Sequence, residues 1–362
     1  MTGRSASVGP EAQYPAAQVS DPRFAEAFKE IAITPDSPRG HIHLASLFIR
    51  EARRTGDFGL NTQAEAAIGK ALGIDPNNLD ARKLQASLLA TFHRFSEALA
   101  AASELQQQDP NDPFVYGVLT DANVELGYYD DALRAAQKVV DLKPNSSSYA
   151  RVAHIRSLFG EHGGAVQMYK LAARTADPDD KEAQSWCLVQ LGDELWKHGK
   201  YEEAERVYDE ALANFPNYYF ALAGKGRSRA ALGDLSEAAK YLAEAQARQP
   251  NVETIILLGD IYVKQGDVER SKQQFDLVEV VEQKLAANND KKRLALLWAD
   301  QGVRLDEALA IAEHEAELRH DIFTADTYAW CLFKSGRTDD AAKTIKDAMR
   351  LNSNDARIFF HA

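Results

Sequence analysis

The sequence predicts an all-α protein, an α-solenoid of about nine helical hairpins, from three observations. Proline recurs at regular intervals, four of the five being 34 residues, at Pro76, Pro110, Pro144, Pro178, Pro216 and Pro250. Between these prolines, a glycine is followed five residues later by a small residue, as in Gly127–Ala132 and Gly199–Ala204. On both sides of each glycine, apolar residues recur at the i, i+3, i+4, i+7 spacing of a helix that faces a core. Because so short a helix pair cannot bury its own apolar face, it is stable only when stacked on copies of itself.

The clearest copy spans residues 185–216. Its first helix carries three leucines on one face: Leu188, Leu191 and Leu195. Gly199 is predicted to end this helix, because glycine enters the left-handed conformation without steric cost. The second helix has Ala204 and Tyr208 on its apolar face and ends before Pro216, where a helix cannot continue.

The other copies are located by the same two markers. The glycine marker gives Gly127–Ala132, Gly160–Ala165, Gly199–Ala204, Gly233–Ala238, Gly266–Ser271 and Gly336–Ala341. In residues 77–110, His93 takes the place of the glycine, and histidine tolerates the left-handed region better than most residues. Each marker proline is followed by Asn or Asp, which we expect to be the N-cap of the next helix: Asn77, Asn111, Asn145, Asp179, Asn217 and Asn251.

These markers divide the chain into three parts. Residues 1–40 are expected to be an N-terminal linker with a short amphipathic helix over 21–33, which caps the first repeat or frays. Residues 41–354 form the solenoid, with an enlarged turn at 55–63 in the first hairpin and a degenerate unit at 290–320. Residues 355–362 read as the start of an incomplete C-terminal helix, apolar and without a partner helix. From its apolar side chains we expect that the sequence is truncated here, or that this end docks on another molecule.

A period of 34 residues with two helices per unit resembles the tetratricopeptide repeat. The residues that carry the resemblance in the clearest copy are Leu188, Leu191, Gly192, Leu195, Gly199, Tyr201, Ala204, Tyr208, Ala211 and Pro216. The resemblance covers about residues 41–354 and implies a right-handed superhelix. The chain is similar to uncharacterised bacterial proteins with many such repeats, and this similarity implies no particular activity, because the repeat is a generic scaffold.

The charge and the apolar content of the chain limit the kinds of partner and compartment that we expect. The formal net charge is −12 and no strong basic tract occurs, so we expect no nucleic-acid binding. No apolar run is long enough to span a membrane. The first residues lack the apolar core of a signal peptide, which indicates a cytoplasmic protein as written. An exported protein whose leader is absent is the alternative.

No motif for catalysis or cofactor binding was found: GxxxxGK[ST], GxSxG, CxxC and HExxH are all missing from the sequence. Histidines that lie near one another in the chain have spacings or surroundings unsuited to sharing a metal: His41 with His43, His154 with His162, and His314 with His320. We therefore expect a protein that is not an enzyme, with no catalytic residue, metal or cofactor.

The concave surface remains as the candidate site, because the first helices of stacked hairpins line the inner wall. Its predicted partner-binding residues are Phe114, Asp121, Arg151, Trp186, Asp193, Trp196, Phe220 and Arg227. They place aromatic side chains beside alternating Asp and Arg, and Trp and Arg are enriched at binding hot spots. In the alternative, structural interpretation, Trp186 or Trp196 packs into the neighbouring hairpin and Asp193 pairs with Arg227 or Arg151.

The sequence thus favours a non-catalytic scaffold that binds a protein or peptide in its concave face. Some tetratricopeptide domains grip a C-terminal carboxylate through Lys, Asn and Arg, but the asparagine positions of that pattern are Ser87, Asp121, Ile155 and Asp193 here. The alternatives are a regulatory or self-assembling subunit, with self-association through the C-terminal end, and the repeat part of a longer protein whose effector segment is absent.

Overall fold

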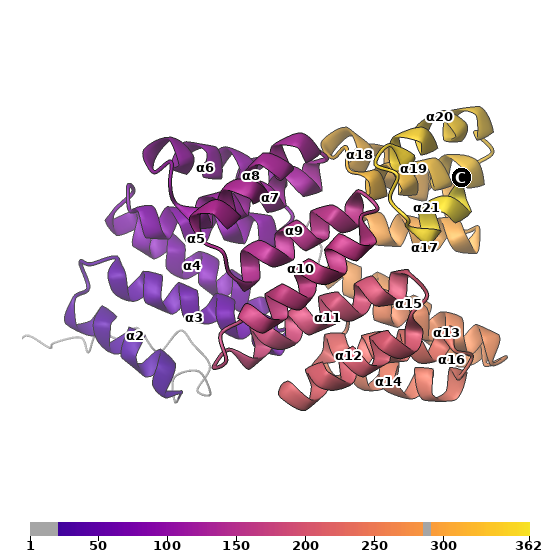
Figure 1. Ribbon diagram of the computed structural model, residues 1–362, viewed down its shortest axis with the longest axis horizontal. Coiled ribbons are helices and arrows are strands. Elements are labelled where there is room, and N and C mark those ends of the chain that lie inside the picture. Colours follow the sequence, from indigo (N-terminus) through magenta and orange to yellow (C-terminus); the bar gives the residue numbers. More distant parts are fainter. Residues whose placement is uncertain (1–20, 285–290) are drawn as a thin grey trace, which may run out of the picture.

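The computed structural model describes residues 21–284 and 291–362, and within them it contains twenty helices and no strand. Eighteen of these helices form nine consecutive hairpins: α3 (Arg39–Thr55) and α4 (Gly59–Ile74), α5 (Leu79–Thr91) and α6 (Phe95–Gln108), α7 (Pro113–Leu126) and α8 (Tyr129–Leu142), α9 (Ser146–Leu158) and α10 (His162–Thr175), α11 (Lys181–Lys197) and α12 (Tyr201–Asn214), α13 (Tyr219–Ala231) and α14 (Leu235–Arg248), α15 (Val252–Lys264) and α16 (Val268–Lys284), α17 (Lys292–Gln301) and α18 (Leu305–Leu318), and α19 (Ile322–Lys334) and α20 (Thr338–Met349). Consecutive helices pack on one another throughout (Figure 1). The predicted right-handed all-α solenoid is confirmed.

The hairpin turns have the backbone that the sequence predicts. All six marker glycines adopt the left-handed conformation, with φ between 72° at Gly160 and 85° at Gly233. His93 adopts it too, with a φ of 57°, so its interpretation as a structural residue is confirmed. Arg304 does the same in the degenerate eighth hairpin, with a φ of 47°, where the sequence offered no marker.

The predicted helix caps are correct at only two of the six proline markers. Asn145 and Asn251 cap α9 and α15. The caps of α5, α7 and α11 lie one residue beyond the prediction: Asn78, Asp112 and Asp180. At these three sites an aspartate precedes the proline and accepts a bond from the N–H two residues on, as Asp75 does from Asn77 at 3.1 Å. This Asx turn delays the start of the helix by one residue.

At the sixth marker the prediction is also wrong, because Asn217 adopts a φ of 63° and α13 begins after Tyr218 without a side-chain cap. The enlarged turn expected at 55–63 is likewise absent from the described chain. The Asp57 carboxylate accepts a bond from the Gly59 N–H at 3.0 Å, and α4 starts at Gly59.

The N-terminal amphipathic helix is present as α2 (Pro22–Ile33), while residues 1–20 of the expected linker lie outside the described residues. The Asp21 side chain caps α2 by accepting from the Arg23 N–H. Phe24 and Phe28 are buried, and the Phe24 ring lies 5.1 Å from that of Phe48 on α3. Helix α2 therefore covers the apolar face of the first hairpin.

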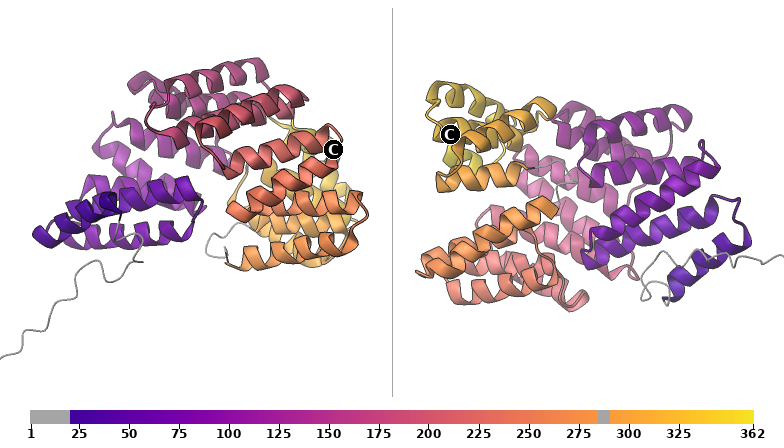
Figure 2. Two further views of the ribbon diagram at one scale, coloured as in Figure 1. Left: turned by 90° about the horizontal axis from the view of Figure 1, so that it is seen from below. Right: turned by 180° about the vertical axis from the view of Figure 1, so that it is seen from behind.

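The solenoid curves so far that its last hairpins return to its third and fourth (Figures 1 and 2). The turn between α18 and α19 docks on the junction of α7 and α8. There the His320 N–H donates to the Leu126 carbonyl at 3.1 Å, and the Ile322 N–H donates to the Tyr129 hydroxyl at 3.0 Å. The Arg319 guanidinium pairs with Glu125 and lies 3.3 Å from Asp321. We call this contact the closure contact.

The C-terminal helix α21 (Ala356–His361) packs on α19 of its own chain, which corrects the expectation of a helix start without a partner. His361 and Arg357 pair with the buried Asp326 at 2.8 and 3.0 Å. Ile358 is buried, whereas Phe359 and Phe360 are 54% and 76% exposed. Docking or self-association through these two phenylalanines stays a prediction.

Candidate partner-binding cavity

A cavity of about 1430 Å³ lies on the inner side of the closed superhelix, lined by residues from Ile49 on α3 to Arg357 on α21. We call it the central cavity. Its wall combines side chains from the first helices of the hairpins with the closure contact, including Glu125 and Arg319. The repeat pattern predicts the first part of this wall. The second part depends on the return of the last hairpins.

Four of the eight predicted site residues line the central cavity: Phe114, Asp121, Arg151 and Trp186. The two aromatic side chains are 42% and 36% exposed, although they belong to different hairpins. Arg151 binds the Asp121 carboxylate with two donors, Nε to Oδ1 at 2.8 Å and Nη2 to Oδ2 at 2.6 Å. Gly117 leaves room for this guanidinium, since a Cβ there would lie 3.3 Å from Arg151 Cζ. The result is an aromatic surface beside a fixed ion pair.

The other four predicted residues are not among the described residues that line the cavity: Asp193, Trp196, Phe220 and Arg227. Arg227 forms an ion pair with Asp193, which also accepts a bond from the Tyr208 hydroxyl at 2.7 Å. The Arg227 guanidinium lies 5.5 Å from the Trp196 ring centre. For Asp193 and Arg227, the structure matches the alternative interpretation, in which the two residues pair with each other in a structural role.

Several cavity residues carry no sequence marker, because their contacts join different hairpins. Arg53 on α3 reaches Glu182 on α11 at 2.9 Å, and Glu182 accepts a bond from the Tyr218 hydroxyl at 2.7 Å. Arg293 on α17 pairs with Glu253 on α15. In total, seven Lys or Arg and eight Asp or Glu line the cavity. The cavity is therefore close to neutral although the chain carries a formal charge of −12.

Asp260 on α15 faces the same cavity as Asp300 on α17. Partial burial on the cavity wall, followed by the negative charge of Asp300, raises the pKa of Asp260 from 3.8 to about 6. The folded chain therefore holds this proton to a higher pH than the unfolded chain does. The free energy of unfolding falls as the pH rises through this interval, and the loss persists at neutral pH.

We expect Asp260→Asn to raise the free energy of unfolding at pH 8 by ~1 kcal/mol, allowing for screening by water at an exposed side chain. Below about pH 3 the gain should vanish, because the aspartate is then largely protonated in both states. Urea unfolding of the wild type and the variant across this pH range measures the difference. Equal gains at low and high pH would contradict the assignment.

Comparisons of this chain with known proteins indicate the family of its repeats. A tetratricopeptide repeat model matches residues 49–113 and 189–253. The mouse protein O-mannosyl-transferase TMTC1 is 26% identical over 155 residues, which are 40% of this chain and 16% of that protein. This chain therefore spans only a small part of the length of that curated relative.

Two solved structures share the fold over most of this chain. One is the crystal structure of the APC/C hetero-tetramer Cut9-Hcn1, with a TM-score of 0.52, 17% identity, and coverage of 91% of this chain and 55% of that one. The other is the human IFIT1 dimer with PPP-AAAA, with a TM-score of 0.55, 12% identity, and coverage of 92% and 88%. At these identities the likeness concerns the fold alone.

Over the described part of the chain, no helix combines the length and apolar character needed to cross a membrane. The repeat model matches residues 49–113 and 189–253, and the described residues form nine hairpins of this kind. Proteins built from this repeat are interaction scaffolds. This chain is a tetratricopeptide repeat protein.

Proposed function

We propose that this chain is a non-catalytic scaffold that binds an extended segment of a partner protein in the central cavity. The observation that carries the proposal is the pair of solvent-accessible aromatic side chains, Phe114 and Trp186, on the inner wall of a closed superhelix. Exposed aromatic residues framed by charged groups are the usual anchors of a protein interface.

The size and charge of the cavity favour a peptide over other ligands. Small-molecule sites commonly occupy about 300–1,000 Å³, and the central cavity exceeds this range at about 1430 Å³. Its near balance of acidic and basic side chains suits a segment with charges of both signs around an apolar anchor. The same balance argues against nucleic acid, which requires clustered cations.

The ion pairs of the cavity wall would orient a bound partner more than they would add to its affinity. Asp121 and Arg151 already satisfy one another through two bonds, and Arg53 is likewise engaged by Glu182. A partner would therefore gain most from burying the two aromatic rings. The paired charges would orient polar groups of the partner around them.

A peptide-display selection against the full chain tests the proposal. We expect selected peptides to bind the double variant Phe114→Ser, Trp186→Ser at least ~30-fold more weakly, since the loss of even one anchor of this kind costs about 2 kcal/mol. Phe333→Ser is the matched control, because Phe333 is 50% exposed and is not among the residues that line the cavity. A photocrosslinker in place of Ala183, which also lines the cavity, should capture the peptide, and one at the exposed Val268 of α16 should not.

Circular dichroism checks that the double variant keeps its helices. Peptides that bind the double variant as tightly as the wild type would contradict the cavity as the binding site. Selection of nucleic acid in preference to peptide would contradict the partner class.

A further inference from the structure

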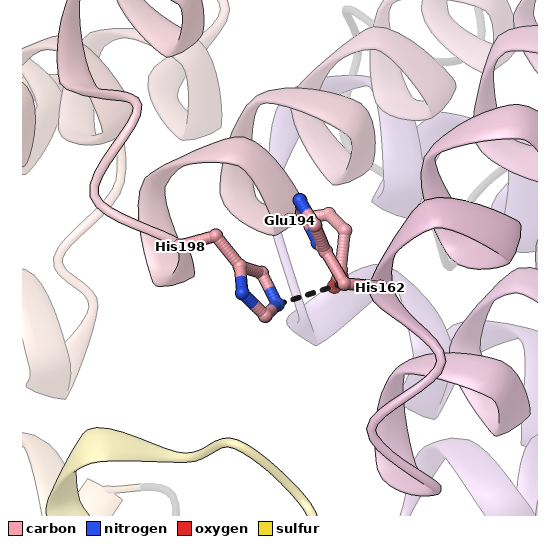
Figure 3. Close-up of side chains that lie close together, drawn as sticks. All are labelled: His162, Glu194 and His198. Carbon is pink, nitrogen blue, oxygen red and sulfur yellow. Dashed lines mark hydrogen bonds and ion pairs between the residues drawn. The ribbon is translucent and has the colours of Figure 1, made fainter.

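Three side chains with metal-binding atoms meet outside the central cavity, between the fourth and fifth hairpins (Figure 3). His162 is the first residue of α10, Glu194 lies in the last turn of α11, and His198 is the C-cap of α11. One ligand atom from each lies within 4.8 Å of the others. His162 and His198 are 36 residues apart in the sequence, so only the packing of α10 on α11 joins them.

The two distances from the histidine nitrogens to Glu194 suit a shared tetrahedral ion. His162 Nδ1 lies 3.0 Å from Glu194 Oε1, and His198 Nε2 lies 3.5 Å from the same oxygen. Ligands about 2.0–2.1 Å from a tetrahedral zinc ion are ~3.3 Å from one another. The two measured separations bracket that value. The dashed line of Figure 3 marks the contact between His198 and Glu194.

Glu194 is held in the manner of a metal ligand. It is 2% exposed, and its second oxygen, Oε2, accepts a bond from the Ser157 hydroxyl at 2.6 Å. Within residues 21–284 and 291–362, its only ion-pair partners are the two histidines. A carboxylate this deeply buried is costly without a positive charge beside it. Ligating groups are typically fixed by a further hydrogen bond of the kind that Ser157 supplies.

The two imidazole rings lie against each other, with centres 3.3 Å apart and planes inclined by 34°. Two imidazoles on one tetrahedral zinc ion have ring centres ~5 Å apart, so the two rings would separate as they bind it. Zinc binds histidine in the neutral form and would place a positive charge beside the buried Glu194 side chain. Each histidine side chain is 21% exposed, so water can complete the coordination.

We propose that His162 Nδ1, Glu194 Oε1 and His198 Nε2 bind one zinc ion, with water as the fourth ligand. Two histidines and a carboxylate are a known zinc ligand set. The ion would join the start of α10 to the end of α11 and so fix the fourth hairpin to the fifth. The proposal departs from the sequence expectation of no metal, which considered only histidines near one another in the chain.

Titration of the metal-free full chain with zinc sulfate, in competition with a chromophoric chelator, tests the proposal. We expect one ion per chain, and a loss of affinity of at least ~100-fold in both His162→Gln and His198→Gln, exceeding the 10–100-fold typical of outer residues. Ser157→Ala should lose about 10–100-fold in zinc affinity, because Ser157 bonds to a ligand and not to the ion. His314→Gln is the control and should bind like the wild type, because His314 lies on α18 with a side chain that is 68% exposed.

Cobalt gives a readout that does not depend on stability. Co²⁺ in the wild type should produce the visible absorption of a four-coordinate ion, and this absorption should be lost in the two histidine variants. Zinc should also raise the thermal midpoint of the wild type and of His314→Gln, but not that of His198→Gln. Equal zinc binding by the wild type and both histidine variants, or no binding by the folded wild type, would overturn the site. Tighter binding of iron(II) than of zinc would overturn the choice of metal.

Discussion

Replacing Gly127 with alanine is expected to separate the last two hairpins from the third and fourth. Gly127 has a φ of 80°, and a Cβ there would lie 2.3 Å from the His320 carbonyl oxygen and 2.7 Å from the Asp321 nitrogen. Both are backbone atoms of the closure contact, so no side-chain movement relieves the clash. We expect a loss of ~1–3 kcal/mol from overpacking, in addition to ~1–2 kcal/mol for the left-handed conformation of alanine.

Gly199→Ala is the matched control for this prediction. Gly199 has a φ of 74° in an equivalent hairpin turn, but nothing lies within 4 Å of a Cβ built on it. Gly199→Ala therefore carries the conformational cost of a left-handed alanine but causes no clash. Small-angle X-ray scattering should give a larger radius of gyration for Gly127→Ala alone, and urea unfolding should rank it as the less stable variant. The same radius and stability in both variants would show that the closure contact does not hold the superhelix shut.

The second large effect is expected at Tyr208, where truncation to alanine should destabilise the chain by ~3–5 kcal/mol. The Tyr208 side chain is fully buried between two helices. Built on Gly192 of α11 or Gly224 of α13, a Cβ would lie 2.4 or 2.5 Å from its ring, so both glycines are needed to admit it. The ring therefore joins the fifth hairpin to the sixth.

Tyr208→Phe separates packing from hydrogen bonding. It removes only the hydroxyl that donates to Asp193, for which we expect a loss of ~1.5–3 kcal/mol, because that acceptor is charged. Urea unfolding followed by circular dichroism measures both variants. Because neighbouring hairpins supply most of the stability of a solenoid, the alanine variant should also split the transition into two steps. A loss below ~1 kcal/mol for Tyr208→Ala would contradict the role assigned to the ring.

Most of the local structure could be predicted because its causes lie within one repeat. The marker glycines and His93 end helices through their own backbone preferences, and Tyr208 is buried through its place on an amphipathic face. The cap predictions failed where a second local signal competed. Asp75, in forming an Asx turn, moved the cap from Asn77 to Asn78.

Tertiary contacts determine which of the predicted groove residues line the central cavity and which do not. Phe114 and Trp186 line the cavity, and their role in partner binding stays a prediction. Asp193 and Arg227 were assigned to the same surface, but they pair with each other between adjacent hairpins. Whether a polar residue on an inner helix is free or paired depends on the neighbouring repeat, and the periodic pattern does not contain that information.

The sequence by itself determined the repeat, the number of hairpins and the family, because each depends on interactions within 34 residues or between adjacent units. Only the tertiary structure decided that Arg319 reaches Glu125, that the central cavity forms, and that His162 meets His198. The closure contact arises from small rotations between successive hairpins that add up over the whole solenoid. A local sequence pattern fixes each rotation only loosely, so their sum is set by the packing of all nine hairpins together.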